Sequence, residues 1–218
     1  MKNQYAGDLH DYRKLGILRI LADSYKKIGV VWMLTENDKG NFGNQTSYLL
    51  KNGNNEKYKF FDYALYEKLR EKFIENNNDG TEKFIEKENR NVKQLEDILN
   101  DNGKFVFFDK LDELKDISNT ENIELLFFDP DDGIGKSTER HLSWEEFVKY
   151  SNKDMLIVQF IRYNNQIKGI IENIKKYIPE SQKVLAIKGG SVVYFYIANS
   201  VKIEKMKENL LDIVLLPI

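Results

Sequence analysis

The sequence predicts a three-layer α/β fold whose central sheet is mostly parallel and ends in an antiparallel hairpin. Two observations lead to this fold class. Short apolar runs rich in Val, Ile, Phe and Tyr recur along the chain, with stretches of helical periodicity between them. Near the C-terminus, two such runs are joined through Gly189-Gly190, a pair suited to the positive φ angles of a tight hairpin.

The apolar runs are the expected strands. Several of them are almost continuously apolar, which is typical of strands that are covered on both faces of a sheet. We therefore expect helices on both sides of the sheet. The runs are residues 28–34, 58–61, 104–108, 123–128, 155–161, 183–187 and 192–198.

Helices are expected between these strands. Asp8 is suited to cap a first helix, with Asp11 three residues further on, as in a capping box. Asn- and Gly-rich stretches at 51–57 and 75–83 predict exposed loops. Apolar side chains at helical spacing predict four further helices, at Leu65, Leu69 and Phe73, at Val92, Leu95 and Leu99, at Ile167, Ile170, Ile171, Ile174 and Ile178, and at Ile203, Met206 and Leu210.

Length and composition favour one globular domain over residues 1–218. A hydrophobic fraction of 41% in 218 residues is enough to build a core, and we find no internal repeat or linker. The 33 Lys and Arg residues nearly balance 35 Asp and Glu, giving a net charge of −2, unlike a dedicated nucleic-acid-binding protein. The absence of cysteine excludes thiolate nucleophiles, iron–sulfur clusters and cysteine zinc sites.

The chain also lacks the patterns of membrane proteins. No run approaches the roughly 18 apolar residues of a membrane-spanning helix. The first residues lack the apolar core of a signal peptide. We therefore expect a cytoplasmic protein without a membrane partner, whose oligomeric state the sequence does not indicate.

The stretch IELLFFDPDDGI, residues 123–134, runs from a buried strand into three carboxylates. In open α/β sheets, ligands bind beyond the carboxyl ends of the strands. Pro130 biases Asp129 toward an extended conformation, and Gly133 lets the backbone approach a ligand. We therefore predict Asp129 and Asp131 as catalytic residues that face an acceptor. A turn that simply ends the strand is the alternative interpretation.

A second candidate region combines the first helix with the loop after the first strand. Asp11 and Lys14 are three residues apart and share one helix face, near an N-terminus that attracts anions. Gly40 and Gly43 stand in the kind of turn that lets backbone approach a nucleotide. A capped surface helix and a plain exposed loop are the alternatives.

These residues also carry a resemblance to a known family. Ala6, Gly7, Asp11 and Lys14 match in register the opening of the J-type adenine methyltransferases of large-subunit ribosomal RNA, which begin with Ala-Gly-Asn, Ala-Asp-Val and a Lys. That family also has a strand ending in Asp-Pro-Pro-Tyr, where this chain has Asp-Pro-Asp-Asp. The resemblance implies a Rossmann-like methyltransferase-type sheet and a nucleic acid or nucleotide as methyl acceptor. It also implies S-adenosylmethionine bound at Gly7, Asp8, Asp11, Lys14, Gly40 and Gly43.

The chain departs from the family at the acceptor position. Asp131 and Asp132 replace the second proline and the tyrosine, so the ring that stacks on a flipped base is missing. Tyr163, which follows the run at 155–161, is a candidate replacement for this ring.

Two other functions remain open, one of them not catalytic. Carboxylates are preferred ligands of Mg²⁺ and Mn²⁺, so an acidic cluster can serve a metal-dependent phosphoesterase or nuclease. The chain can also be a noncatalytic module that binds a nucleotide or a protein. The residues of the metal hypothesis are Asp8, Asp11, Asp129, Asp131 and Asp132.

Overall fold

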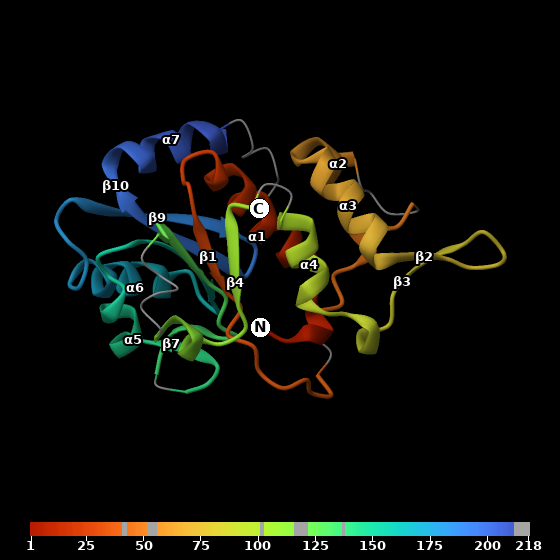
Figure 1. Ribbon diagram of the computed structural model, residues 1–218, viewed down its shortest axis with the longest axis horizontal. Helices are drawn as coiled ribbons and strands as arrows, with labels where there is room; N and C mark the ends of the chain where they lie inside the picture. Colours follow the sequence, from red (N-terminus) through yellow and green to blue (C-terminus); the bar gives the residue numbers. More distant parts are fainter. Residues whose placement is uncertain (41–42, 52–55, 101–102, 116–121, 137, 212–218) are drawn as a thin grey trace.

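The structure, a computed structural model, describes residues 1–40, 43–51, 56–100, 103–115, 122–136 and 138–211. Its centre is a six-stranded sheet in the order β4-β1-β5-β8-β10-β9 (Figure 1). The first four strands in this order run parallel, and β10 is antiparallel to both β8 and β9. The prediction of a mostly parallel sheet that ends in an antiparallel hairpin is confirmed. The strands are β1 (Ile28–Val31), β4 (Phe105–Phe108), β5 (Leu125–Phe128), β8 (Asp154–Phe160), β9 (Gln182–Gly189) and β10 (Val192–Asn199).

Helices cover both faces of this sheet (Figure 1). One face shares a hydrophobic core with α1 (Leu9–Ala22), α3 (Tyr63–Phe73), α4 (Val92–Leu99) and α7 (Ser200–Leu211). The other face packs against α5 (Trp144–Lys149) and α6 (Asn165–Lys175) through a second core. The fold therefore has the three layers that the sequence predicts.

Shorter elements surround these layers. They are α2 (Glu56–Phe61), the hairpin of β2 (Ile74–Asn76) and β3 (Glu82–Phe84), the pair β6 (Gly133–Gly135) and β7 (His141–Ser143), and 3₁₀ turns at Asn3–Tyr5, Ser47–Leu49, Lys87–Asn89 and Leu111–Lys115. Within the described part of the chain, no helix combines the length and apolar character needed to cross a bilayer.

The first helix begins at the predicted cap. The Asp8 carboxylate accepts hydrogen bonds from the backbone N–H groups of His10 at 2.8 Å and Asp11 at 3.1 Å. Asp11 does not complete a capping box on Asp8, because its carboxylate accepts from the Gly7 N–H at 2.9 Å. The segment before the helix is thereby tied to its first turn.

One predicted element is wrong, and another is confirmed only in part. Residues 58–61 are not a strand but the end of α2, where Tyr58 and Phe61 pack edge-to-face on Tyr12 of α1. Aromatic side chains raise strand propensity, yet here they cover a helix. The predicted loop at 75–83 is an exposed turn at 77–81, but its two ends pair as strands β2 and β3. This hairpin projects from the body of the protein in Figure 1. Residues 52–55 of the other predicted loop, and 41–42 between Gly40 and Gly43, lie outside the described residues.

The strand order has a switch point at β1. From β1 the chain crosses to β4 on one side, and it later enters β5 on the other side of β1. In open α/β sheets, ligands bind beyond the carboxyl ends of the two strands at such a point. The segments after β1 and β5 meet there, since the Asp129 N–H donates to the Val31 carbonyl at 3.0 Å.

Replacing Gly133 by alanine is expected to destabilise the protein by more than the left-handed backbone alone explains. Gly133 has a φ of +93°, and an added Cβ would lie 2.4 Å from the Gln159 side chain. Gly80 is a matched control, with a φ of +79° and nothing within 4 Å of an added Cβ. Gly80→Ala should therefore cost about 1–2 kcal/mol, and Gly133→Ala more. Urea denaturation checks this, and equal losses would contradict the packing argument.

Candidate functional site

The centre of the candidate site is the ammonium group of Lys14, buried between α1 and the end of β5. Its Nζ lies 2.9 Å from Asp11 Oδ1 and 2.7 Å from Asp129 Oδ2. None of these three side chains is more than 4% exposed. Asp8, which is also buried, adds a third negative charge that acts on Lys14. We call Asp8, Asp11, Lys14 and Asp129 the Lys14 cluster, which unites four of the predicted site residues.

The Lys14 cluster holds three carboxylates against one ammonium. Burial raises the pKa of Asp11 to about 6, although Lys14 lowers it. Burial also raises the pKa of Asp8. Burial alone would lower the pKa of Lys14, but Asp11, Asp129 and Asp8 raise it above its usual value, so the amine stays protonated. A further cation nearby would lower the pKa of these carboxyl groups, which burial raises.

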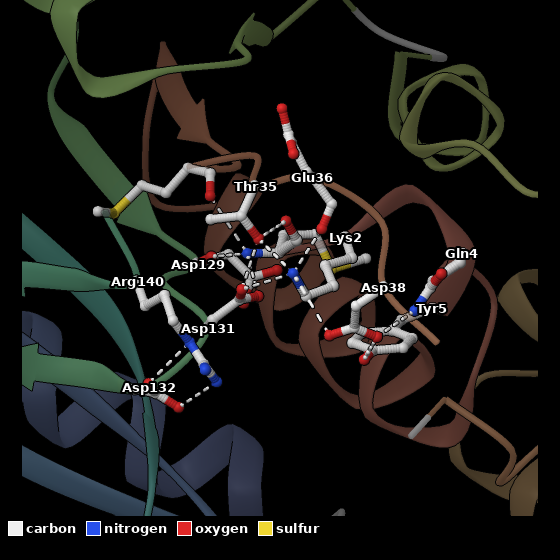
Figure 2. A network of polar contacts seen from close by, with 12 residues as sticks. Lys2, Gln4, Tyr5, Thr35, Glu36, Asp38, Asp129, Asp131, Asp132 and Arg140 are labelled. Carbon is white, nitrogen blue, oxygen red and sulfur yellow. Dashed lines mark hydrogen bonds and ion pairs between the residues drawn. The ribbon is translucent and has the colours of Figure 1, made fainter. Parts of the chain in front are cut away.

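Asp131 lies close to Asp129 of this cluster (Figure 2). Its carboxylate binds the nitrogen of Met1. That ammonium is 2.8 Å from Asp131 Oδ1 and donates to the backbone carbonyls of Asp129 at 3.0 Å and Met33 at 3.3 Å. Burial would raise the pKa of Asp131, but the ammonium of Met1 holds it below its usual value. Asp131 is therefore ionised and part of a cation-binding position.

The Met1 side chain fills the space next to the Lys14 cluster. It is buried, and its sulfur lies 3.9 Å from Lys14 Nζ. Lys2 and Thr35 lie next to Asp131 (Figure 2). The Thr35 hydroxyl donates to Asp131 Oδ2 at 2.6 Å, and Lys2 Nζ donates to the Thr35 hydroxyl oxygen at 3.0 Å. Asp129 and Lys14 thus touch directly, with Met1 beside them.

Asp132, Gly40 and Gly43 contact residues other than those of the Lys14 cluster. Asp132 is paired with Arg140, whose Nε is 3.0 Å from Asp132 Oδ2. The Gly40 N–H donates to Asp38 Oδ1 at 2.8 Å, and an added Cβ on Gly43 would lie 2.6 Å from the Tyr5 ring. The two glycines of the loop after β1 therefore contact their own loop and the N-terminal segment, and not the Lys14 cluster.

Gly7 takes part through its backbone. Besides donating to Asp11, it accepts a hydrogen bond from the Tyr48 hydroxyl at 3.0 Å. These bonds hold the chain in place just before the helix cap. Gly7 therefore positions Asp11 within the Lys14 cluster.

Sequence reasoning missed Met1, Lys2 and Thr35. Thr35 follows the first predicted strand at the same edge as Asp129, so the argument from strand ends applied to it equally. No pattern in the sequence indicates that Met1 and Lys2 fold back onto Asp131.

The carboxylates do not form a metal site. Among the described residues, no group of three or more His, Asp and Glu side chains is arranged to hold a metal ion. Asp11 and Asp129 bind the Lys14 ammonium, and Asp132 binds Arg140. Protein cations thus occupy the positions that the metal hypothesis assigns to Mg²⁺, and the geometry gives that hypothesis no support.

A separate depression of about 490 Å³ lies between α3 and the β2–β3 hairpin. None of the predicted site residues lines it. Its lining residues are Glu67, Lys68, Arg70, Glu71, Ile74, Asn76 and Glu82.

Comparison with known proteins assigns no family. A scan against protein-family models finds no match to this chain. A search of curated proteins finds no significant match. The interpretation of the site therefore depends on its own residues.

The Asp11→Asn variant is expected to lose a pH dependence of stability between about pH 4 and pH 6. The folded-state pKa of Asp11, about 6, lies above its reference value of 3.8, so the folded protein retains a proton that the unfolded chain releases. The stability from this proton is present below about pH 4 and lost as the pH rises through about 6, a difference of roughly 3 kcal/mol.

Urea denaturation across this range measures the effect. The free energy of unfolding should fall more for the wild type than for Asp11→Asn as the pH rises. Parallel pH profiles of the two proteins would contradict the raised pKa.

Proposed function

We propose that the protein is an S-adenosylmethionine-dependent methyltransferase that acts on a nucleic acid or a nucleotide. The resemblance of residues 6–14 and 129–132 to the J-type adenine methyltransferases supports this proposal. The parallel sheet with its reversed strand β10 is consistent with a methyltransferase-type sheet. The Lys14 cluster also lies at the switch point between β1 and β5, where such a sheet would bind a ligand.

The observation that carries the proposal is the way in which Met1 is bound. Its α-ammonium and its sulfur are groups that the methionine part of the cofactor also presents. The ammonium binds the Asp131 carboxylate and the carbonyls of Met33 and Asp129. The space beside the Lys14 cluster therefore has the chemistry to hold a methionine-derived ligand.

The charge of the cluster fits the cofactor better than it fits Met1. The thioether of Met1 is neutral, whereas the sulfonium of S-adenosylmethionine carries a positive charge. Three carboxylates and one ammonium leave the cluster short of positive charge when its carboxyl groups are ionised. A sulfonium nearby would offset part of that deficit.

Asp131 would hold the cofactor ammonium, and the carboxylates of the Lys14 cluster would face its positive charge. When bound, the cofactor supplies an electrophilic methyl group. The protein contributes mainly position, since aligning the two reactants removes much of the entropic barrier. In this arrangement Asp129 and Asp131, predicted to face the acceptor, act on the cofactor side. Met1 would have to leave the space it fills.

A noncatalytic binding module is the second candidate. It is favoured by the same Met1 side chain, which is buried and packs against the Lys14 cluster. A permanently bound Met1 would close the space to a cofactor. Binding measurements separate the two functions.

Calorimetric titration with S-adenosylhomocysteine is expected to show binding. At a hundredfold excess over Kd, the ligand should raise the free energy of unfolding by about 2.7 kcal/mol. Adenosine alone should bind more weakly, because it lacks the ammonium that Asp131 would bind. Asp131→Asn should weaken binding of S-adenosylhomocysteine by about 1.5–3 kcal/mol, the contribution of a hydrogen bond to a charged group.

Asp132→Asn is the matched control, because the neighbouring Asp132 carboxylate binds Arg140 instead. This variant should bind as the wild type does. No binding at millimolar ligand would contradict the methyltransferase proposal and favour the noncatalytic module. Equal losses in both variants would contradict the role of Asp131.

A further inference from the structure

A surface of basic side chains and exposed aromatic rings lies at the carboxyl end of β8. Phe160, the last residue of β8, is 39% exposed, and Tyr163, in the turn that leads to α6, is 69% exposed. The two rings lie three residues apart in the chain and reach solvent at the same strand end. We use the name β8-end surface for Phe160 and Tyr163 together with three basic residues, Arg13, Arg162 and Lys188.

Contacts bring α1 and the β9–β10 turn to this strand end. The Phe160 ring packs edge-on against the ring of His10, with centroids 6.1 Å apart. Arg13, one turn further along α1, donates to the Gly189 carbonyl at 3.3 Å. Burial and the charges of Lys14 and Arg13 lower the pKa of His10 to about 4, so its ring is neutral and packs as an apolar group.

A further contact joins the β9–β10 hairpin to the turn that carries Tyr163. Lys188 Nζ donates to the side-chain oxygen of Asn164 at 2.9 Å. The turn is itself held by Gln166, whose side-chain oxygen accepts from the backbone N–H groups of Arg162 at 2.9 Å and Tyr163 at 3.1 Å. The backbone that carries the exposed ring is therefore fixed in place.

The positive charge of this surface is not neutralised. None of the ion pairs between described residues includes Arg13, Arg162 or Lys188. In contrast, Arg140 is paired with the carboxylate of Asp132, in the turn formed by residues 129–132. Three cations without carboxylate partners, next to exposed rings, form a surface that is complementary to an anionic and aromatic ligand.

The β8-end surface borders the candidate cofactor site. Gln159, adjacent to Phe160, donates from its amide nitrogen to the Asp132 carbonyl at 3.2 Å and accepts from the Ile134 N–H at 2.9 Å. On the other side, His10 donates its backbone N–H to Asp8 of the Lys14 cluster. A ligand on this surface would therefore lie next to the turn formed by residues 129–132.

We propose that the β8-end surface binds a single strand of nucleic acid, with a base stacked on Tyr163 and phosphates held by Arg13, Arg162 and Lys188. An exposed ring stacks on a base of any sequence, but only where the base is not already stacked in a duplex. The surface would thus present an unpaired base to the methyltransferase site. Its role as acceptor surface rests on the proposed function, whereas strand binding does not.

Fluorescence anisotropy with a labelled single strand of about 12 nucleotides tests this inference. Tyr163→Ala should weaken binding about five- to 150-fold, the effect of removing one stacking ring, while Tyr163→Phe should retain the wild-type affinity. Tyr63→Ala is the matched control, because Tyr63 is 63% exposed but lies at the start of α3. It should leave the affinity unchanged.

The salt dependence tests the basic residues separately. Arg162→Ala should reduce the slope of log K against log salt by about 0.7, the value for one lost phosphate contact on a single strand. Lys205→Ala on α7, also at an exposed position, should leave the slope unchanged.

Two results would overturn the inference: unchanged affinity of Tyr163→Ala, or tighter binding of a duplex than of the single strand. Binding of S-adenosylhomocysteine is measured independently of these two results. If S-adenosylhomocysteine binds and the strand does not, this surface assignment falls and the methyltransferase proposal stands. If the strand binds and S-adenosylhomocysteine does not, the surface assignment stands and the methyltransferase proposal falls.

Discussion

The burial of the Lys14 ammonium between α1 and the end of β5 is the interaction on which the rest of the site depends. A buried ammonium is tolerated only when carboxylates surround it closely, and here Asp11 lies at 2.9 Å and Asp129 at 2.7 Å. One of these carboxylates belongs to the helix and the other follows a strand more than a hundred residues later. The ion pair therefore fixes the first turns of α1 against the switch point of the sheet.

This arrangement sets the charge at the switch point of the sheet. Because Asp8, Asp11 and Asp129 outnumber Lys14, the cluster attracts positive charge, and Asp131 beside it binds an ammonium. On the other side of the turn formed by residues 129–132 the charge is positive, because basic side chains lie around exposed rings at the end of β8. The two proposed ligands, a cationic methionine derivative and an anionic strand, would thus bind at one edge of the sheet.

Much of the fold follows from local patterns in the sequence, whereas the environment of the site does not. The six strands of the central sheet were predictable because each is an apolar run flanked by turn residues. The cap at Asp8 was predictable because a carboxylate can accept hydrogen bonds from the first N–H groups of a helix. Residues 58–61 were wrongly predicted as a strand. Tyr58 and Phe61 cover Tyr12 of α1, and this tertiary contact overrides strand propensity. Likewise, the strand-end rule brought Asp129 near α1, but no local pattern shows that Lys14 pairs with it directly or that Met1 fills the space beside them.

A double-mutant cycle on Lys14 and Asp129 measures whether these two buried charges stabilise each other. Lys14→Met leaves buried carboxylates without their cation and should destabilise the protein by about 3–5 kcal/mol. Adding Asp129→Asn removes one of those carboxylates, so the double variant should be more stable than the sum of the two single effects by about 1–3 kcal/mol. Additivity within about 0.5 kcal/mol would show that the two charges do not depend on each other, and would contradict the account.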